Sequence, residues 1–554
     1  MDAGLLAISA YTPARDRQGR LVSGARMDVF VNRTTTRAAV YADAALTTPL
    51  PNPVIANSSG QFPAVWAQGG SDESPTLYTV GYALATGGSI GNPSVFDDVR
   101  PSVSLDLVSG DSKADLDGAN VDANAFRHSI GADLSQNVNF NLGAVGAVSR
   151  TLAQRAAERV SVKDFGAAGD NETDDTAAIN AAIAWCNTQV FPVDLHFPRG
   201  FYKITSALAP VRGPTRLVGS GPRNTVVTFY GNYDCITFAG NADGWIGHCG
   251  LLDMGLFCAA MTGGRTIVAD NAIGGEIRNI LCDAPFNFAH LQQASNWTVS
   301  LVDAQPVRGE YGIKWIGTNT VRNGRIDKSD VLTLRDVTLH GLNVAGAGST
   351  ADALWLEGYV HTLVISNVRL LAMKRGVLAT NQSAVPANLV PSFALGAGLE
   401  IENPYHEAIR LEAMTGLWVN GLFCVGSTAD CGIHIGANAR QVHLHGGRVA
   451  GNFTDGIYSE GNNVSLTGID VYNNSRFASD AFSGVRCAGG STFLIGQCVI
   501  GKPDGEPAYT ERQKFGIANV SDATLKMAVV ASDLTGNVSG ATSGAMSVTG
   551  CFTV

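Results

Sequence analysis

Short segments with a small first residue and alternating apolar positions recur through the second half of this 554-residue chain. The first residues of these segments are Gly312, Ala353, Gly376, Ala408, Gly432, Gly456, Gly484 and Gly516. A second series interleaves with the first, at Gly421, Gly446, Gly468 and Gly496. Two strand types repeating together every 22–32 residues in most steps fit one turn of a parallel β-helix. Its coils stack about 4.8 Å apart.

The residues inside each segment support this interpretation. Ile409 and Leu411 alternate with polar neighbours, and Ile433 and Ile435 do the same one repeat later. Because side chains alternate between the two faces of a strand, these residues are expected to point into the coil. A leucine-rich repeat is the alternative, but its characteristic leucine and asparagine spacing is absent. We therefore predict an all-β chain whose main body is a right-handed parallel β-helix.

The pattern divides the chain into three zones. Residues 1–108 alternate in short runs broken by proline and glycine, which predicts a small β-rich domain of hairpins. Residues 109–159 are rich in small residues and end in a short helix candidate, so they are expected to form a neck. Residues 160–554 carry the repeat and are expected to form the β-helix.

Composition excludes several classes of function. The net charge is −10 and only 16% of residues are charged, which argues against nucleic acid as the main partner. No secretion signal and no 18-residue apolar run are visible, so we expect no membrane insertion. The ten cysteines include no Cys-x-x-Cys pair and are expected to be buried free thiols.

The stretch VSVKDFGAAGDNETDDTAAINAAI, at 160–183, gathers acidic residues ahead of a helical pattern. Asp174 or Asp175 is a helix N-cap candidate, and Ile179 and Ile183 follow at helical spacing. An EF-hand calcium loop would need a different spacing and a closing glutamate. We therefore interpret the acidic cluster as structural, in a helix that covers the open end of the first coil.

This stretch resembles the start of pectate-lyase-like right-handed β-helix domains. Together with the preceding GAVSRTLAQRAAERVSVKDFGA it resembles the junction in tailed-bacteriophage tailspikes and tail fibres. VYADAALTTPLPNPVIANSSGQFP, at 40–63, also resembles the virion-anchoring domains of such spikes. The resemblance covers roughly residues 25–200, and beyond them only the repeat supports it.

The resemblance implies a phage tailspike, carried on the virion tail and assembled in the host cytoplasm. Its N-terminal domain would attach to a tail, baseplate or connector protein, and the chain would form a homotrimer. It would bind a bacterial surface polysaccharide and depolymerise it by glycoside hydrolysis with paired carboxylates, without cofactor or metal. Two alternatives stay open, a polysaccharide lyase on the same fold and a receptor-binding or adaptor fibre without activity.

Aligning the repeats predicts which side chains share the outer face. Two residues after a marker lie Trp355, Arg410, His434 and Tyr458. Four residues after a marker lie Glu357, Glu412 and Glu460. Aromatic rings and polar tips of this kind suit sugar binding. Glu412 and Glu460 would be two coils apart, roughly 9.6 Å, near the upper limit for an inverting glycosidase. We predict them as catalytic residues, and Trp355, Glu357, Arg410, His434 and Tyr458 as substrate-binding residues.

A competing catalytic pair is Glu400 and Glu402, which alternation places on one face of a single strand. Asp430, Asp455 and Asp480 precede successive strands and could line a rim. His443 and His445 also share a strand face, but no further ligands are visible, so we interpret them as solvent-facing residues.

Overall fold

A computed structural model describes most of the β-helix and parts of the N-terminal region. The described residues are 4–8, 12–13, 21–68, 78–83, 95–99, 139–140, 147–156, 158–240, 244–318, 321–322, 325–326, 328–342, 348–381, 391–501, 512–521 and 525–551. The chain divides into two compact units, Met1–Gln154 and Arg155–Val554. None of the helices in these ranges has the length and apolar character needed to cross a membrane.

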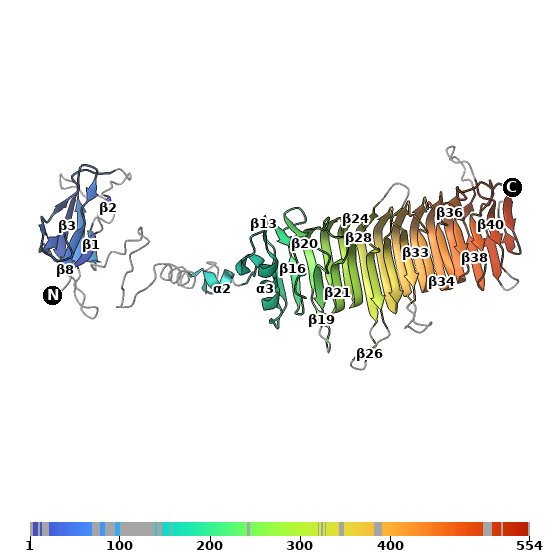
Figure 1. Cartoon of the computed structure of the whole chain (residues 1–554), viewed down its shortest axis with the longest axis horizontal. Helices are drawn as coiled ribbons and strands as arrows, with labels where there is room; N and C mark the ends of the chain where they lie inside the picture. The colour runs from blue at the N-terminus through green and yellow to red at the C-terminus, as the bar shows by residue number, and fades with distance from the viewer. Residues whose placement is uncertain are drawn as a thin grey trace. The chain divides into compact units, whose positions relative to one another are not determined.

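The N-terminal unit contains small antiparallel sheets (Figure 1). One sheet has the strand order β1 (Gly4–Ile8), β8 (Val65–Gln68), β4 (Val40–Tyr41), β5 (Pro49–Leu50). Another has the order β10 (Val95–Val99), β9 (Tyr78–Ala83), β3 (Arg26–Val31), β6 (Val54–Ile55), and β2 (Thr12–Pro13) pairs with β7 (Gln61–Phe62). Met27, Val29 and Val65 are among the fully buried residues of a core of its own. The prediction of a small β-rich region is therefore confirmed.

Short elements follow in the zone predicted as a neck. Strand β11 (Asn139–Phe140) pairs with β12 (Arg150–Thr151), and a five-residue helix, α2 (Leu152–Ala156), comes next. The predicted boundary at residue 108 lies outside the described residues, so it stays a prediction.

The acidic stretch is structural, as predicted. A 3-10 turn, η1 (Val162–Phe165), precedes β13 (Asp170–Asp174) and helix α3 (Thr176–Cys186), which buries Ile179 and Ile183. Asp175 is the N-cap by position, yet its carboxylate accepts hydrogen bonds from the backbone of Ala168 (2.6 Å) and Gly169 (3.2 Å). Asp174 instead accepts from the helix backbone, at Thr176 (3.1 Å). The carboxylates therefore hold the loop and the helix that begin the coil.

The second unit is a parallel β-helix, seen in Figure 1 as a row of stacked coils. Within the described residues its strands form one continuous 29-stranded sheet from β13 to β43, and all their pairings are parallel. Each coil contributes to three faces, which we call sheets A, B and C in chain order. The predicted fold is confirmed.

Sheet A carries the first marker series. Its strands are β18 (Ile236–Ala239), β21 (Arg265–Ile273), β23 (Asn287–Ser295), β25 (Tyr311–Gly317), β29 (Asp352–Gly358), β31 (Arg375–Thr380), the starts of β33 (Ile409–Val425) and β34 (Ile433–Ala450), β35 (Ile457–Ser459), β37 (Val485–Cys487), β40 (Phe515–Asn519) and β42 (Gly540–Ser543). A short strand, β19 (Ile246–Gly247), pairs with the end of β21.

Sheets B and C share long strands that bend in the middle. These are β20 (Gly250–Phe257), β22 (Glu276–Asp283), β24 (Trp297–Val307), β28 (Ser329–Gly341), β30 (Val360–Leu371), β32 (Ser392–Glu402), the later parts of β33 and β34, and β36 (Asn462–Tyr472). Sheet B also has β14 (Val193–His196), β16 (Thr215–Val218), β38 (Thr492–Gly496), β41 (Lys526–Val530) and β43 (Ser547–Thr549). Sheet C also has β13, β15 (Gly200–Ile204), β17 (Thr225–Phe229) and β39 (Val499–Ile500), and a hairpin of β26 (Val321–Arg322) and β27 (Arg325–Ile326) follows β25.

One residue per coil makes the bend between sheets B and C, with a left-handed backbone. The residues and their φ angles are Asp253 (56°), Asn279 (53°), Leu301 (53°), Asp336 (54°), Asn367 (53°), Gly398 (64°), Gly421 (68°), Gly446 (61°), Gly468 (64°), Gln497 (54°) and Ala531 (47°). Three members of the second marker series are thus confirmed, and the fourth was placed one residue early, at Gly496. Glycine and asparagine adopt this conformation at least cost, which explains the series.

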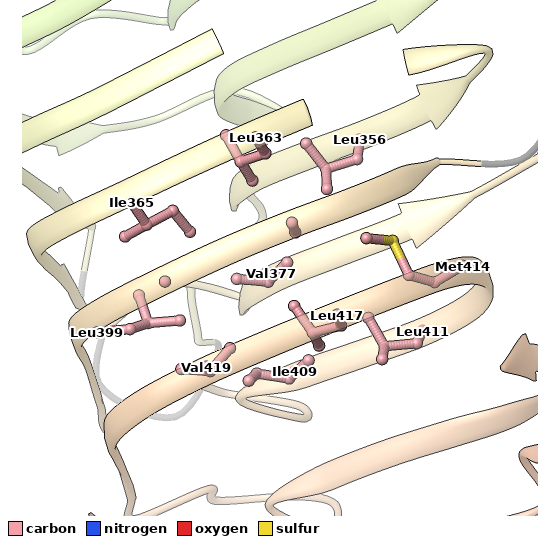
Figure 2. Close-up of a pocket in the computed structure, with 12 residues that line it drawn as sticks. Leu356, Leu363, Ile365, Val377, Leu399, Ile409, Leu411, Met414, Leu417 and Val419 are labelled. Atoms are coloured by element: carbon pink, nitrogen blue, oxygen red, sulfur yellow. The ribbon is translucent and has the colours of Figure 1, made fainter. Parts of the chain in front are cut away.

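The interior of the coils is a continuous apolar core. Figure 2 shows a small cavity of about 20 Å³ inside it, lined only by apolar side chains and by Gly396. Leu363, Val377 and Leu417 are among the lining residues drawn there. A space lined by no polar groups is a packing gap, because a water molecule there would find no hydrogen-bond partner.

Candidate functional site

The outer face of sheet A brings the predicted column together. Strand register pairs each of its members with the next, in the order Lys314, Trp355, Leu378, Arg410, His434, Tyr458, Arg486. We call this column, together with the neighbouring Glu357, Glu412 and Glu460, the sheet A strip. The side chains of Trp355, Arg410, His434 and Tyr458 are all partly exposed. The predicted alignment is therefore confirmed.

A buried glycine, Gly436, separates the two exposed glutamates of the strip. Strand β34 has an extra residue at this point, so Gly436 and Ala437 lie opposite Glu412. A Cβ on Gly436 would come within 3.4 Å of Glu412 Cα, and on the other side Glu460 N donates to Ile435 O at 2.7 Å. The two carboxylates therefore flank a position of the coil that has no large side chain. We call this position the Glu412–Glu460 gap.

The end of the strip near β25 is occupied by contacts within the protein. Lys314 Nζ lies 3.4 Å from the centroid of the Trp355 ring and 2.5 Å from Glu357 Oε2. Trp355 Nε1 donates to Thr380 Oγ1 at 2.8 Å. One face of the indole is thus covered by an ammonium group, and only the other face remains for a ligand.

The centre of the strip is a network around His434. Its Nδ1 lies 3.8 Å from Glu407 Oε1, and its Nε2 lies 3.8 Å from Glu460 Oε2. The Tyr458 ring meets the imidazole edge-on at 5.0 Å, and its hydroxyl donates to Glu460 at 3.4 Å. On the next coil Arg410 Nε donates to Glu412 at 3.0 Å. Glu460 thus has an imidazole and a phenol beside it, whereas Glu412 has a guanidinium.

Glu407, which was not among the predicted site residues, contacts this network from its buried side. Its side chain is 3% exposed and contacts Arg375 Nε at 2.9 Å and Arg410 Nη1 at 2.5 Å. Arg375 also reaches the buried Asp352, at 3.2 Å. Burial alone would raise the pKa of Glu407, but His434, Arg375 and Arg410 hold it well below its usual range.

The sequence does carry a pattern for these buried charged residues, one residue before the markers. The position just before each marker reads Tyr311, Asp352, Arg375, Glu407, Cys431, Asp455 and Ser483. Acids and an arginine alternate there, which would have pointed to an internal ion-pair ladder. The alignment tested only outward positions, so it passed over this offset.

Asp455 is another buried carboxylate beside the strip. Ser483 N donates to its Oδ1 at 2.6 Å, and Arg486 Nη1 lies 4.0 Å from Oδ2. Burial raises the pKa of Asp455 to about 6. Arg486 in turn lies over the Tyr458 ring, 5.9 Å from its centroid.

The competing pair lies on another face. Glu400 and Glu402 are at the sheet C end of β32, where Arg369 Nε donates to Glu400 Oε2 at 2.7 Å. The Arg369 contact lowers the pKa of Glu400, whereas burial and then the neighbouring Glu400 raise that of Glu402. The structure therefore does not bring this pair together with the sheet A strip.

One group of metal-type donors lies at the edge of sheet A. Donor atoms of His406, Glu407 and Asp430 lie within 4.8 Å of one another. His406 Nδ1 is 2.7 Å from Asp430 Oδ2, but Glu407 is already held by Arg375 and Arg410. Two guanidinium groups on one ligand oppose a cation there, so these residues do not fit a metal centre.

On sheet B, His443 hydrogen-bonds with Ser465 at 2.6 Å and stacks on Trp418.

Known proteins similar to this chain share its fold. A family model described as rhamnogalacturonase A/epimerase, pectate lyase-like, matches residues 159–284. Tailspike protein 3 of bacteriophage CBA120 has a TM-score of 0.55 at 15% identity, covering 78% of this chain and 69% of that one. The A-module of mannuronan C-5 epimerase AlgE6 from Azotobacter vinelandii has a TM-score of 0.46 at 15% identity, covering 71% and 98%. The second unit is thus a pectate-lyase-like, right-handed parallel β-helix.

A further match is confined to a short segment. The non-secreted LysM effector LysM19 of Penicillium expansum is 48% identical over 56 residues, which are 9% of this chain. The chain spans only 4% of the length of that curated relative. The fold family includes polysaccharide-processing enzymes, and the activity of this chain has to be argued from its own residues.

Proposed function

We propose that this protein binds a bacterial surface polysaccharide along the sheet A strip and hydrolyses it in the Glu412–Glu460 gap. The observation that carries the proposal is the gap itself, in which two exposed carboxylates flank a position without a large side chain. They lie two coil steps apart, about 9.6 Å along the stack at a strand spacing of about 4.8 Å. That distance is close to the 6.5–9.5 Å typical of inverting glycosidases, which hold a water molecule between carboxylate and sugar.

The neighbours of the two carboxylates suggest their roles. Glu412 shares a charge-assisted hydrogen bond with Arg410, which favours a carboxylate that accepts a proton from water. Among the described residues, Glu460 lacks a guanidinium contact like that of Glu412, and its contacts are with the Tyr458 hydroxyl and the His434 imidazole, so we assign it as the acid. Water would attack the anomeric carbon as Glu412 takes its proton, while Glu460 gives a proton to the departing glycosidic oxygen.

His434 and Tyr458 are placed to hold the sugar and Glu460 at once. Glu407 faces His434 Nδ1 from the buried side, which leaves Nε2 toward Glu460. Glu407 is therefore a positioning residue in this scheme, because it would act through the imidazole and not on the substrate.

We also propose that the protein works as a phage tailspike. Support comes from the N-terminal antiparallel sheets with their own core, from the motifs at 40–63 and 160–183, and from the fold shared with a phage tailspike. In this role the N-terminal unit would attach the chain to a tail protein, and three copies would assemble on the virion.

Single substitutions test the hydrolytic proposal. Purified chain is mixed with a panel of bacterial surface polysaccharides, and release of reducing ends is measured for Glu412→Gln and Glu460→Gln. We expect each variant to lose at least a hundredfold in rate, with products of inverted anomeric configuration from the parent protein. Glu400→Gln and Glu402→Gln are matched controls on sheet C and should retain the parental rate. Binding without release by the parent would assign the non-enzymatic receptor-binding fibre instead.

A further inference from the structure

Three cations on or behind the strip are already paired with carboxylates of the protein. Lys314 contacts Glu357, and Arg375 contacts both Asp352 and Glu407. Arg410 contacts Glu407 and Glu412. A substrate carboxylate could engage any of these groups only by displacing a protein carboxylate, which would leave a buried or half-buried charge without its partner.

The exposed charged groups on the two sides of the gap are acidic. Side-chain exposure is 50% for Glu412 and 39% for Glu460, against 14% for Lys314, 17% for Arg375 and 29% for Arg410. A sugar seated in the gap would therefore lie between two exposed carboxylates, with the cations behind them.

Arg486 is the one strip cation with a loose partner among the described residues. Its side chain is 40% exposed and lies 4.0 Å from Asp455. It belongs to the coil after Tyr458, beyond Glu460, and its guanidinium lies over the tyrosine ring. It is therefore placed to contact a neighbouring sugar and not the sugar held between Glu412 and Glu460.

Electrostatics then favours an uncharged sugar in the gap. Like charges close together repel, and they repel more strongly near a protein surface than in bulk water because the surroundings screen them less. A uronate over the gap would meet the negative charge of Glu412, while Glu460, as the proposed acid, carries its proton. The net charge of −10 adds a repulsive field that slows the approach of any polyanion.

We propose that the polysaccharide is neutral at the cleavage position, so that the sugar between Glu412 and Glu460 carries no carboxylate. This inference rests on the proposed function and narrows its substrate class to neutral hexose or N-acetylhexosamine units. It also separates the site from β-elimination chemistry, which needs a free cation to stabilise the enolate formed beside a uronate carboxylate.

Carboxyl reduction provides a matched probe. Each uronate-containing polysaccharide of the panel is compared with its carbodiimide-activated, borohydride-reduced form, in which every uronate has become the parent hexose. Binding of the full chain is measured by biolayer interferometry alongside neutral polysaccharides, and at two salt concentrations. We expect binding to neutral polymers that changes little with salt, and at least tenfold tighter binding of a reduced polymer than of its native form.

Variants without the two glutamate charges test whether the gap causes the preference for neutral polymers. In the Glu412→Gln, Glu460→Gln double variant, discrimination against native uronate polymers should fall at least fivefold. Tighter binding of a native uronate polymer than of its reduced form, lost in Arg486→Gln, would overturn the inference and leave polysaccharide binding intact. Absence of binding to every polymer of the panel would instead overturn the proposed function, and the inference with it.

Discussion

At the residue scale, the sheet A strip depends on a carboxylate that solvent barely reaches. Glu407 is 3% exposed, yet two arginines and an imidazole surround it. A buried charge is tolerated only with partners of this kind, and removing one partner leaves the others uncompensated. The exposed Glu412 shows the contrast, because water replaces its partner easily.

Glu407→Gln should therefore destabilise the protein by about 3 kcal/mol. The substitution preserves side-chain shape but leaves Arg375 and Arg410 without their shared negative charge. Urea unfolding followed by circular dichroism measures the effect, and Glu412→Gln is the exposed control, expected to change stability by at most about 1 kcal/mol. A loss below 1 kcal/mol for Glu407→Gln would show that the buried ion pairs do not hold this face together.

Asp455 makes stability depend on pH in a defined direction. Its pKa rises from 3.8 to about 6 on burial, so between these values the folded chain binds more protons than the unfolded one. Stability should then fall as pH rises from 4 to 6, by up to about 3 kcal/mol from this group. Asp455→Asn should remove that slope and be the more stable form at pH 7. Parallel stability curves for the two proteins from pH 4 to 7 would contradict the assignment.

At the element scale, two glycines of β32 differ in what the fold asks of them. Gly396 points into the core cavity, and an added Cβ would meet Val419 and Ile365 only at 3.6–3.7 Å. Gly398 has φ +64° and makes the bend between sheets B and C. Only the second position needs glycine for its backbone conformation.

Gly396→Ala should stabilise the protein by roughly 0.5–1 kcal/mol, because it fills the cavity and restricts the unfolded chain. Gly398→Ala, two residues away, should destabilise it by roughly 1–2 kcal/mol through left-handed strain. Thermal unfolding of both variants distinguishes these effects. A destabilised Gly396→Ala protein would mean that the interior is packed more tightly than the cavity indicates.

The same elements show what the sequence could predict. Gly421, Gly446 and Gly468 marked the bend because glycine repeats visibly, whereas Asn367 and Gln497 at equivalent bends carry no glycine signal. Outward columns followed from period-2 alternation. The contact of Glu407 did not follow from alternation. Glu407 precedes its strand, and its side chain reaches Arg410 on the outer face. Alternation describes only residues within a strand.

At the scale of the whole molecule, the sequence repeat predicted the long β-helix. The composition only excluded broad classes of function. Stacking identical faces places chosen side chains in rows over many coils, so a single register decides which charges become neighbours. The sequence could not show that Lys314 would cover Trp355 or that the cations would be paired from within. Those contacts depend on rotamers and on coil spacing, which only coordinates provide.

The central claim is that a polysaccharide is cut between Glu412 and Glu460 on sheet A. A crystal structure of the Glu460→Gln variant with an oligosaccharide of a cleaved polymer tests it most directly. We expect the glycosidic oxygen within hydrogen-bond distance of residue 460 and the anomeric carbon above Gly436, on the side facing Glu412. An oligosaccharide bound instead along sheet C, with its glycosidic bond beside Glu400 and Glu402, would contradict the claim.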